Sequence, residues 1–476
     1  MHRRMELSWS PRARSAGLLC FLALSAGFSA CAGSAPVHTG PPPAPGARGT
    51  FLALSDIHFD PFSDPTLVPR LIQADSGQWQ EIFASAPPAA VSPYGKDANV
   101  QLFTSALAAA RRFAPHPDFI LISGDFLAHD FQKKLDAAAP GQGDDGYRRF
   151  VQKTLEYVSG RIRAAFPESP IFPALGNNDS FCGDYKIEPS GAFLAMLQKV
   201  WRPLLGDHHG SFDQTFPVSG AYSVPHPTIP KHRLIVLNSV FFSAKYQNAC
   251  GSGPAPDSAE LDWLAGEIHD AARKGETIWL VHHVPPGIDA FGTLNAKGSC
   301  ASNPVSLWQA EDLAAFSRLT AEPAGIVAAS FAGHTHMDEF RMPSGGGFIH
   351  VTPAVSPLFG NNPGFQVFDY DRASGAIRDM RTYFLPLAPA PAPGTQPQWR
   401  LECSFRREYR QTGYDAGSLE KIRRAIENDP AVRRSYMTLY PVGSAEERAS
   451  DQQHWKVYWC GIASFTPQEF ARCYCP

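Results

Sequence analysis

The sequence predicts an α/β fold, with a β-sheet core covered by helices. Seven short apolar runs are candidate strands, at residues 51–55, 118–123, 170–175, 233–239, 277–283, 326–333 and 348–355. Amphipathic helical patterns lie between several of them, at residues 100–113, 147–166 and 258–275. Because the runs are apolar on both faces and helices separate them, we expect the strands to be buried beneath the helices.

The composition is that of a folded globular protein. Of 476 residues, 44% are hydrophobic and 18% are charged, so the chain is long and apolar enough to bury a large core. The net charge is -3. Because a nucleic-acid-binding surface needs an excess of positive charge, we expect no nucleic-acid partner.

Residues 1–31 have the layout of a secretory signal peptide. Several arginines precede the apolar run GLLCFLALSAGFSA, which ends at Cys31. The tetrad FSAC resembles a bacterial lipobox, in which the cysteine becomes the lipidated first residue of the mature chain. We therefore expect export to the bacterial periplasm or cell surface as a lipoprotein attached to the membrane through Cys31. Plain secretion is the alternative.

Two Pro-rich stretches divide the rest of the chain. Residues 32–49 form a Pro/Gly/Ala tether and residues 387–398 a linker. Residues 50–386, between them, hold all the candidate strands. The tail, residues 399–476, lacks strong strand patterns and has a helical pattern at 420–440.

Export changes how the cysteines are interpreted. The cysteines beyond residue 31 are Cys182, Cys250, Cys300, Cys403, Cys460, Cys473 and Cys475. In an oxidising compartment we expect disulfides rather than thiolate metal sites. Their number is odd, so at least one stays free or pairs elsewhere, and the connectivity is left open.

Polar side chains that can bind metals follow five of the candidate strands. They are Asp56 and His58, Asp125 and His129, Asn177 with Asn178 and Asp179, His282 and His283, and His334 and His336. The carboxyl ends of strands in an α/β sheet meet at one crevice, so these side chains are expected to converge. A lone Asp-x-His or His-x-His is more often a surface feature, and an aspartate after a strand is often a helix cap. Five such elements in order indicate a metal site built from oxygen and imidazole ligands.

The order of these motifs, D-x-H, G-D, G-N-x-D, H and G-H-x-H, resembles the calcineurin-like metallophosphoesterases. The stretches LSDIHFDP, SGDFLAHD, HHVPPG, AGHTHMDEF and NNPGFQVFDYD are similar to the acid sphingomyelinase-like phosphodiesterase branch, which shares its architecture with endopolyphosphatases. The resemblance implies a four-layer metallophosphoesterase β-sandwich flanked by helices at residues 50–386. It also implies a small helical, disulfide-bonded C-terminal subdomain at residues 399–476.

The resemblance implies two divalent metal ions, zinc first, with manganese or iron as alternatives. One ion would be held by Asp56, His58 and His336, and the other by Asn177, His283 and His334. Asp125 would bridge them, because two cations about 3.5–4 Å apart need an anion between them. For His282, packing beside the site is the simpler role.

Two further residues are candidates for contact with the phosphate. In this branch two histidines face it, and His129 matches the first, as the proton donor to the leaving group. Asn178 stands where the second histidine is expected. An amide can hydrogen-bond a phosphoryl oxygen but cannot supply a proton. Either the acid role passes to His129, or the site suits substrates whose leaving group needs less protonation.

These features predict an exported, dinuclear metal-dependent phosphoesterase that hydrolyses phosphodiester or phosphoanhydride bonds with hydroxide formed at the metals. Its substrate would be a nucleotide, a phospholipid head group as in sphingomyelin phosphodiesterases, or polyphosphate. The alternative is a lipoprotein that keeps the metals and binds a phosphate ligand but has a weakened catalytic site. The sequence does not predict the oligomeric state.

Overall fold

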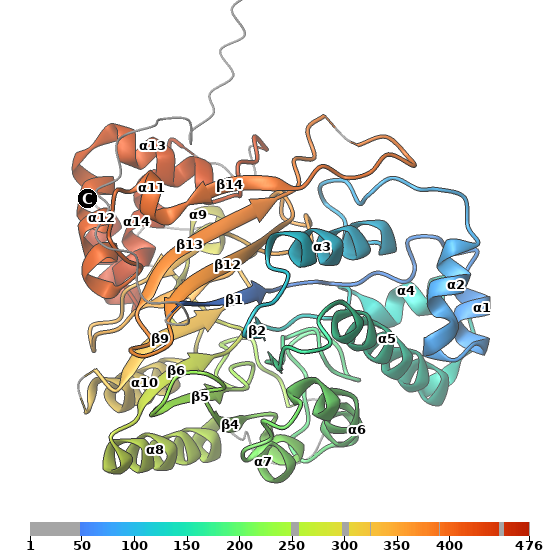
Figure 1. Cartoon of the computed structure of the whole chain (residues 1–476), viewed down its shortest axis with the longest axis horizontal. Coiled ribbons are helices and arrows are strands. Elements are labelled where there is room, and N and C mark those ends of the chain that lie inside the picture. The colour runs from blue at the N-terminus through green and yellow to red at the C-terminus, as the bar shows by residue number, and fades with distance from the viewer. Residues whose placement is uncertain are drawn as a thin grey trace, which may run out of the picture.

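Two six-stranded β-sheets form the core of the chain in a computed structural model, which describes residues 48–248, 257–297, 304–323, 325–389, 391–446 and 452–475 (Figure 1). The strand order of the first sheet is β14-β13-β12-β1-β2-β3, and that of the second is β10-β11-β9-β6-β5-β4. The first sheet consists of β1 (Arg48–Leu54), β2 (Phe119–Ile122), β3 (Ile171–Pro173), β12 (Gly364–Asp371), β13 (Ile377–Phe384) and β14 (Arg400–Ser404). The second consists of β4 (Tyr222–Pro225), β5 (His232–Val236), β6 (Thr277–Val281), β9 (Val327–Ala332), β10 (Glu339–Arg341) and β11 (Ile349–Val351). A separate pair is β7 (Ile288–Asp289) with β8 (Val305–Ser306).

Each of the apolar runs predicted as a strand forms one. They are β1, β2, β3, β5, β6, β9 and β11. The strands that precede the polar motifs run parallel to their neighbours, β1 with β2 and β2 with β3 in the first sheet, and β5 with β6 and β6 with β9 in the second. Parallel strands place their carboxyl ends at one edge, so the loops that carry the polar motifs emerge on the same side of each sheet.

Aromatic side chains fill the space between the two sheets. Phe51 of β1 stacks on Phe119 of β2, with ring centroids 4.9 Å apart, and on Phe368 of β12 at 4.6 Å. Across the interface its ring lies 5.4 Å from that of Phe331 on β9 and 5.6 Å from that of Trp279 on β6. These aromatic contacts hold the sheets face to face, and with them the two sets of loops.

Helices cover the outer faces of both sheets (Figure 1). On the side of the first sheet α3 packs against β12, and on the other side α8 packs against β6 with α10 beside it. This confirms the predicted four-layer arrangement of two β-sheets flanked by helices. In chain order the helices are α1 (Val68–Gln73), η1 (Ser76–Gln78), α2 (Trp79–Ala84), α3 (Val100–Phe113), α4 (Phe131–Ala138), α5 (Gly143–Ala165), α6 (Ala192–Trp201), η2 (Arg202–Leu205), α7 (Phe212–Ser219), α8 (Asp257–Lys274), α9 (Ala290–Asn295), α10 (Ala310–Ala321), α11 (Phe405–Glu408), α12 (Ala416–Asn428), α13 (Pro430–Leu439), α14 (Trp455–Ala463) and α15 (Pro467–Tyr474).

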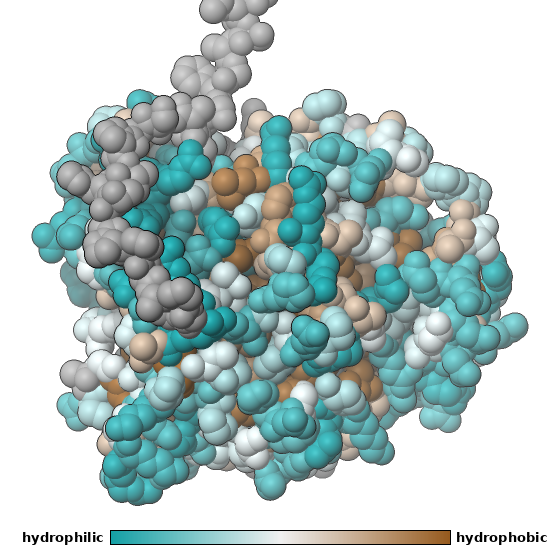
Figure 2. Space-filling view, viewed as in Figure 1, coloured by the Kyte–Doolittle hydropathy of each residue, from teal (hydrophilic) through white to brown (hydrophobic). Residues whose placement is uncertain are grey.

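The surface on the face shown in Figure 2 is mostly hydrophilic, and hydrophobic residues lie in small groups between polar ones. None of the helices within the described ranges combines the length and apolar character that crossing a bilayer requires. The predicted signal peptide (residues 1–31), nearly all of the tether (residues 32–49), Cys250 and Cys300 lie outside the described residues.

The tail differs from the sequence prediction in two places. Residues Arg400–Ser404, in a tail for which no strong strand was expected, form the short strand β14, which pairs antiparallel with β13 at the edge of the first sheet. An edge strand needs only one partner and can be short and polar, which leaves little signal in the sequence. The helix expected over 420–440 is two helices, because Pro430 cannot continue α12 and Asp429 caps α13.

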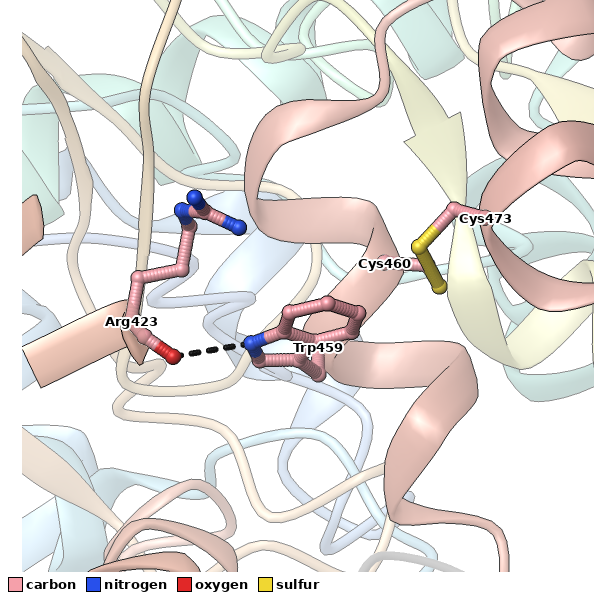
Figure 3. Close-up of a disulfide and its surroundings, with 4 residues drawn as sticks. All are labelled: Arg423, Trp459, Cys460 and Cys473. Carbon is pink, nitrogen blue, oxygen red and sulfur yellow. Dashed lines mark hydrogen bonds between the residues drawn. A yellow bond between two sulfur atoms is a disulfide. The ribbon is translucent and has the colours of Figure 1, made fainter. Parts of the chain in front are cut away.

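A disulfide between Cys460 and Cys473 joins α14 to α15 (Figure 3). Beside it, the indole N–H of Trp459 donates to the carbonyl oxygen of Arg423 on α12, at 2.8 Å. The disulfide is as predicted for the C-terminal region, and these contacts tie three of its helices together. That residues 399–476 form a separate subdomain stays a prediction.

Candidate metal centre

The seven residues predicted as metal ligands lie together where the loops of the two sheets meet. Each follows a strand: Asp56 and His58 follow β1, Asp125 follows β2, Asn177 follows β3, His283 follows β6, and His334 and His336 follow β9. Six of them are buried and His334 is partly buried. The aromatic contacts between the sheets therefore bring together polar groups from five separate segments.

Several of these residues have a strained backbone. The φ angles of Asp56, His58, Asp125, His334 and His336 are 48°, 42°, 56°, 75° and 67°. This left-handed region costs a residue with a side chain about 1 kcal/mol or more, and such strain concentrates at functional sites. Hydrogen bonds between the loops stabilise these strained turns. The N–H of Asp56 donates to the carbonyl oxygen of Gly124 at 3.0 Å, and the N–H of His58 donates to the carbonyl oxygen of Asp125 at 2.9 Å.

Close packing of the loops also requires glycine. A Cβ atom at Gly176 would lie 2.0 Å from the Oδ1 atom of Asp125, and one at Gly124 would lie 2.7 Å from Nδ1 of His283. The glycines of the G-D and G-N motifs therefore let the backbone of one loop approach the ligand side chains of its neighbours.

Asp56, His58 and His336 form a first cluster. The Nε2 atoms of His58 and His336 are 3.2 Å apart. Oδ1 of Asp56 lies 3.4 Å from Nε2 of His336 and 3.8 Å from Nε2 of His58. Three ligand atoms thus surround one point at the end of β1.

Asn177, His283 and His334 form a second cluster. Oδ1 of Asn177 lies 2.8 Å from Nε2 of His283 and 2.9 Å from Nδ1 of His334. Unlike the first cluster, this one contains no carboxylate.

Asp125 lies between the two clusters. Its Oδ2 atom is 3.4 Å from Nε2 of His58 in the first cluster and 3.2 Å from Nε2 of His283 in the second. One carboxylate oxygen is therefore placed to interact with both groups, as a bridging ligand must.

The hydrogen bonds behind the clusters show that the residues fit two metal ions. Nδ1 of His58 lies 2.9 Å from the carbonyl oxygen of Leu127, and Nδ1 of His283 lies 2.6 Å from that of Ser123. A carbonyl only accepts, so each Nδ1 carries a proton, and a ring that gives up its Nε2 proton to a bound cation would offer it a lone pair beside Asp125. Lone pairs, carboxylates and an amide oxygen that converge in this way suit divalent cations such as zinc, manganese or iron.

Charge within the site supports the same conclusion. Burial lowers the pKa of a histidine, but the carboxylate of Asp125 outweighs burial and raises the pKa of His58 and of His283 to about 9. Burial lowers the pKa of His334 and His336 to about 3. Protons on the first pair of rings balance the carboxylate, and cations bound here would take over that role and release them.

His129 stands beside the first cluster. Its ring stacks on that of His58 with centroids 4.0 Å apart, and its Nδ1 lies 2.9 Å from Oδ1 of Asp97. Lys134 donates to the other oxygen of Asp97 at 2.6 Å. Because Asp97 accepts the Nδ1 proton, Nε2 of His129 is left for the cavity. Asp97 belongs to no motif, and nothing in the sequence pairs it with a histidine 32 residues away.

Asn178, which stands where the resemblance implies a second histidine, contacts Asp125. Its backbone N–H donates to Oδ1 of Asp125 at 2.8 Å, and its side-chain Nδ2 donates to Oδ2 at 3.0 Å. Its side chain thus holds the central carboxylate instead of lining the cavity. Asp179 accepts from the N–H groups of Gly176, Phe126 and Leu127 and joins two of the loops.

The other sequence candidate, His282, points inward. Its Nε2 lies 2.8 Å from the hydroxyl of Ser330, and its Nδ1 lies 3.2 Å from the carbonyl of Val284. Two residues that sequence patterns missed contact the second cluster. Asp184 accepts from the amide of Asn177, and the hydroxyl of Tyr185 lies 3.1 Å from Nε2 of His334.

A cavity of about 310 Å³ opens onto both clusters and His129. Phe291 and Phe359 lie at its rim, 47% and 41% exposed. Tyr440 and Tyr458 line it from the C-terminal region, and Lys245 adds a positive charge. The cavity can therefore hold a phosphate group next to the clusters and an aromatic or apolar group next to its rim.

Known proteins are similar to this chain. The profile of the calcineurin-like phosphoesterases matches residues 49–338. The human acid sphingomyelinase-like phosphodiesterase 3b is 29% identical over 86% of this chain and 88% of its own length. The rat cyclic GMP-AMP phosphodiesterase SMPDL3A is 25% identical over 76% of this chain and 77% of its own. A dimetal phosphatase from Danio rerio is 11% identical, with a TM-score of 0.39 over 75% of this chain and 99% of its own.

Proposed function

Because the chain belongs to the calcineurin-like phosphoesterase family, we propose that it is a phosphodiesterase that uses two divalent metal ions. One observation carries the proposal: Oδ2 of Asp125 lies within 3.4 Å of a histidine from each cluster. A buried carboxylate that lies between histidines of two separate clusters is suited to bridge a pair of cations.

The first ion would be held by the first cluster, the second ion by the second cluster, and Asp125 would be common to both. Bound there, the ions would activate a water and neutralise the charge of the phosphate. Zinc is the first choice, because imidazole nitrogen, carboxylate oxygen and an amide oxygen suit it, with manganese or iron as alternatives.

The protein's own side chains supply the remaining steps. Asp97 holds His129 through Nδ1, so a proton on Nε2 can pass to the oxygen of the leaving group. Asn178 keeps Asp125 in place through two hydrogen bonds and supplies no proton. His129 is therefore the general acid in this proposal.

The substrate is a small phosphodiester. The named relatives act on phosphodiesters, since one is called an acid sphingomyelinase-like phosphodiesterase and another a cyclic GMP-AMP phosphodiesterase. Phe291 and Phe359 can pack on a nucleobase or on the apolar part of a phospholipid head group. Asp184 and Asp289 also line the cavity and disfavour a long polyphosphate.

We further propose that the protein is exported. The basic and apolar segments before Cys31 support this, as does the disulfide between Cys460 and Cys473, because such bonds persist in oxidising compartments. Attachment to the membrane through a lipidated Cys31 belongs to the same proposal.

The decisive experiment measures metal content and turnover on the same samples. The protein, stripped with a chelator and reloaded with zinc, manganese or iron, should bind two ions and hydrolyse bis-p-nitrophenyl phosphate. CDP-choline, a cyclic dinucleotide, sphingomyelin, ATP and polyphosphate would then rank the substrates. Two bound ions with no turnover on any substrate would instead support the weakened, phosphate-binding protein.

A further inference from the structure

The loop that follows Asn177, residues 180–187, folds back over the second cluster. The N–H of Tyr185 donates to the carbonyl oxygen of Asn177 at 2.9 Å, and that of Gln247 donates to the carbonyl of Tyr185 at 3.0 Å. The hydroxyl of Ser180 donates to the carbonyls of Gly183 and Lys186 and closes the loop on itself. The loop is thereby held against the ligands rather than extended into solvent.

Asp184, in this loop, determines which way the amide of Asn177 points. Nδ2 of Asn177 donates to Oδ1 of Asp184 at 2.6 Å. An ionised carboxylate only accepts hydrogen bonds, so it selects the amide nitrogen and turns the amide oxygen toward His283 and His334. Without Asp184 the amide could rotate by 180° and present N–H groups to the site, which cannot bind a cation.

Tyr185 acts on the other side of the same cluster. Its hydroxyl lies 3.1 Å from Nε2 of His334, whose Nδ1 faces Asn177. When the Nε2 proton is donated to the tyrosine oxygen, the lone pair lies on Nδ1 and can bind a cation. The ring of Tyr185 is 6% exposed and Nζ of Lys245 lies 5.4 Å from its centroid, so the hydroxyl is held in position.

The charges of the two clusters differ, and Asp184 reduces the difference. The first cluster has its own carboxylate, Asp56, whereas the second is an amide and two imidazoles and shares only Asp125. Asp184 is hydrogen-bonded to the amide of Asn177, and its negative charge increases electron density on the amide oxygen. Asp184 thus places a negative charge next to the second cluster through a hydrogen bond, whereas Asp56 belongs to the first cluster itself.

We propose that Asp184 and Tyr185 set the affinity of the second ion by orienting Asn177 and His334. They are positioning residues and not ligands. The inference rests on the proposed function only in that the second cluster must bind a divalent ion.

The test is to titrate metal-free protein with zinc and measure both dissociation constants by calorimetry, with bound metal counted by mass spectrometry. Asp184→Ala should weaken the second binding event by about 10–100-fold and leave the first unchanged. Asp184→Asn keeps an acceptor of the same size but loses the charge, and should fall between the wild type and Asp184→Ala. Tyr185→Phe should weaken the second event several-fold. Circular dichroism of each variant verifies folding, and Asp184→Asn keeps the test valid if Asp184→Ala does not fold.

Asp289→Asn is the matched control. Asp289 lines the same cavity, but its Oδ1 accepts from the N–H of Gly292 at the start of α9 and contacts no predicted ligand. Asparagine caps a helix as well as aspartate does, so only the charge changes. We expect this variant to bind the second ion as the wild type does. An equal loss of affinity in Asp289→Asn and Asp184→Asn would show a general field effect and overturn the inference.

The result also separates the two proposals. If the wild type binds two ions and the variants at Asp184 and Tyr185 bind both with unchanged affinity, the positioning role is wrong and the proposed function stands. If the wild type binds fewer than two ions, the proposed function fails, and the positioning role fails with it.

Discussion

The two clusters of predicted metal ligands lie at equivalent places in the fold, but different residues surround them. Both consist of side chains at the carboxyl ends of strands, yet the first includes a carboxylate and lies against the ring of His129. The second consists of an amide and two imidazoles, and Asp184 and Tyr185 contact it from outside. The comparison suggests a division of roles, in which proton transfer takes place beside the first cluster while the second depends on its surroundings to hold an ion.

The loop after β9 connects the two clusters. His334 and His336 are two residues apart, and both have positive φ, but His334 joins the second cluster and His336 the first. Asp125 is the other connection, because it contacts a histidine of each cluster. Substitutions in this loop or at Asp125 should affect both clusters, whereas substitutions of the residues around one cluster should affect that cluster alone.

The largest effect is expected for Asp125→Asn, which removes the negative charge shared by the clusters. Without it the repulsion between two cations is not compensated, so turnover should fall by about 10³-fold or more and metal content should fall below two ions per chain. Turnover of bis-p-nitrophenyl phosphate and metal analysis on the same samples would measure both. If Asp125→Asn keeps both ions and full turnover, the shared-carboxylate assignment is wrong.

A smaller loss of turnover, without loss of either metal ion, is expected for His129→Gln beside the first cluster. Glutamine cannot protonate a leaving group, so hydrolysis of glycerophosphocholine, which releases an alkoxide, should slow by about 100-fold. Bis-p-nitrophenyl phosphate, whose leaving group needs no proton, should be affected much less, and both ions should remain bound. Asp97→Asn should show the same pattern at about tenfold. Equal losses on the two substrates would contradict the acid role of His129.

The smallest effect on turnover, close to none, is expected for Glu260→Gln behind the second cluster. Burial raises the pKa of Glu260 from 4.5 to about 8, although its Oε1 accepts from the N–H of Asn238. The folded state therefore holds this proton more tightly than the unfolded state, and the free energy of unfolding should fall as pH rises from about 4.5 to about 8. Glu260→Gln removes this dependence and should stabilise the protein at pH 8 by on the order of 2 kcal/mol.

Thermal melting at pH 5 and pH 8 would measure the change, with turnover as the control. Asn238 precedes Ser239, whose hydroxyl accepts from the N–H of His283 at 3.2 Å. If the pH dependence of turnover changes in Glu260→Gln, then ionisation of Glu260 affects catalysis. The expectation that this residue behind the second cluster affects only stability would then be wrong.

Much of the fold and the types of the site residues could be predicted from the sequence. Apolar runs such as residues 118–123 are continuous along the chain and long enough to be recognised as buried strands, and the polar residues that follow them are their immediate neighbours. The edge strand β14 and the break before Pro430 were missed, the first because a short polar strand has a weak pattern.

The roles of individual side chains depended on the tertiary structure. Asn178 occupies a motif position at which a phosphate contact is expected, but it bonds to Asp125, 53 residues away. Asp97 and Asp184 belong to no motif, and their partners are determined by the paths of separate loops. A hydrogen bond needs positions correct to a few tenths of an ångström, and no local pattern specifies this.

The sequence alone thus determined where strands end and which side chains of the types that can bind metals follow them, because both are local properties of the chain. The tertiary structure decided how these side chains divide into two clusters, which carboxylate lies between them and which neighbours orient them. The physical reason is that apolar periodicity is encoded in adjacent residues, whereas coordination and hydrogen bonding depend on distances between loops that only the packing of the two sheets brings together.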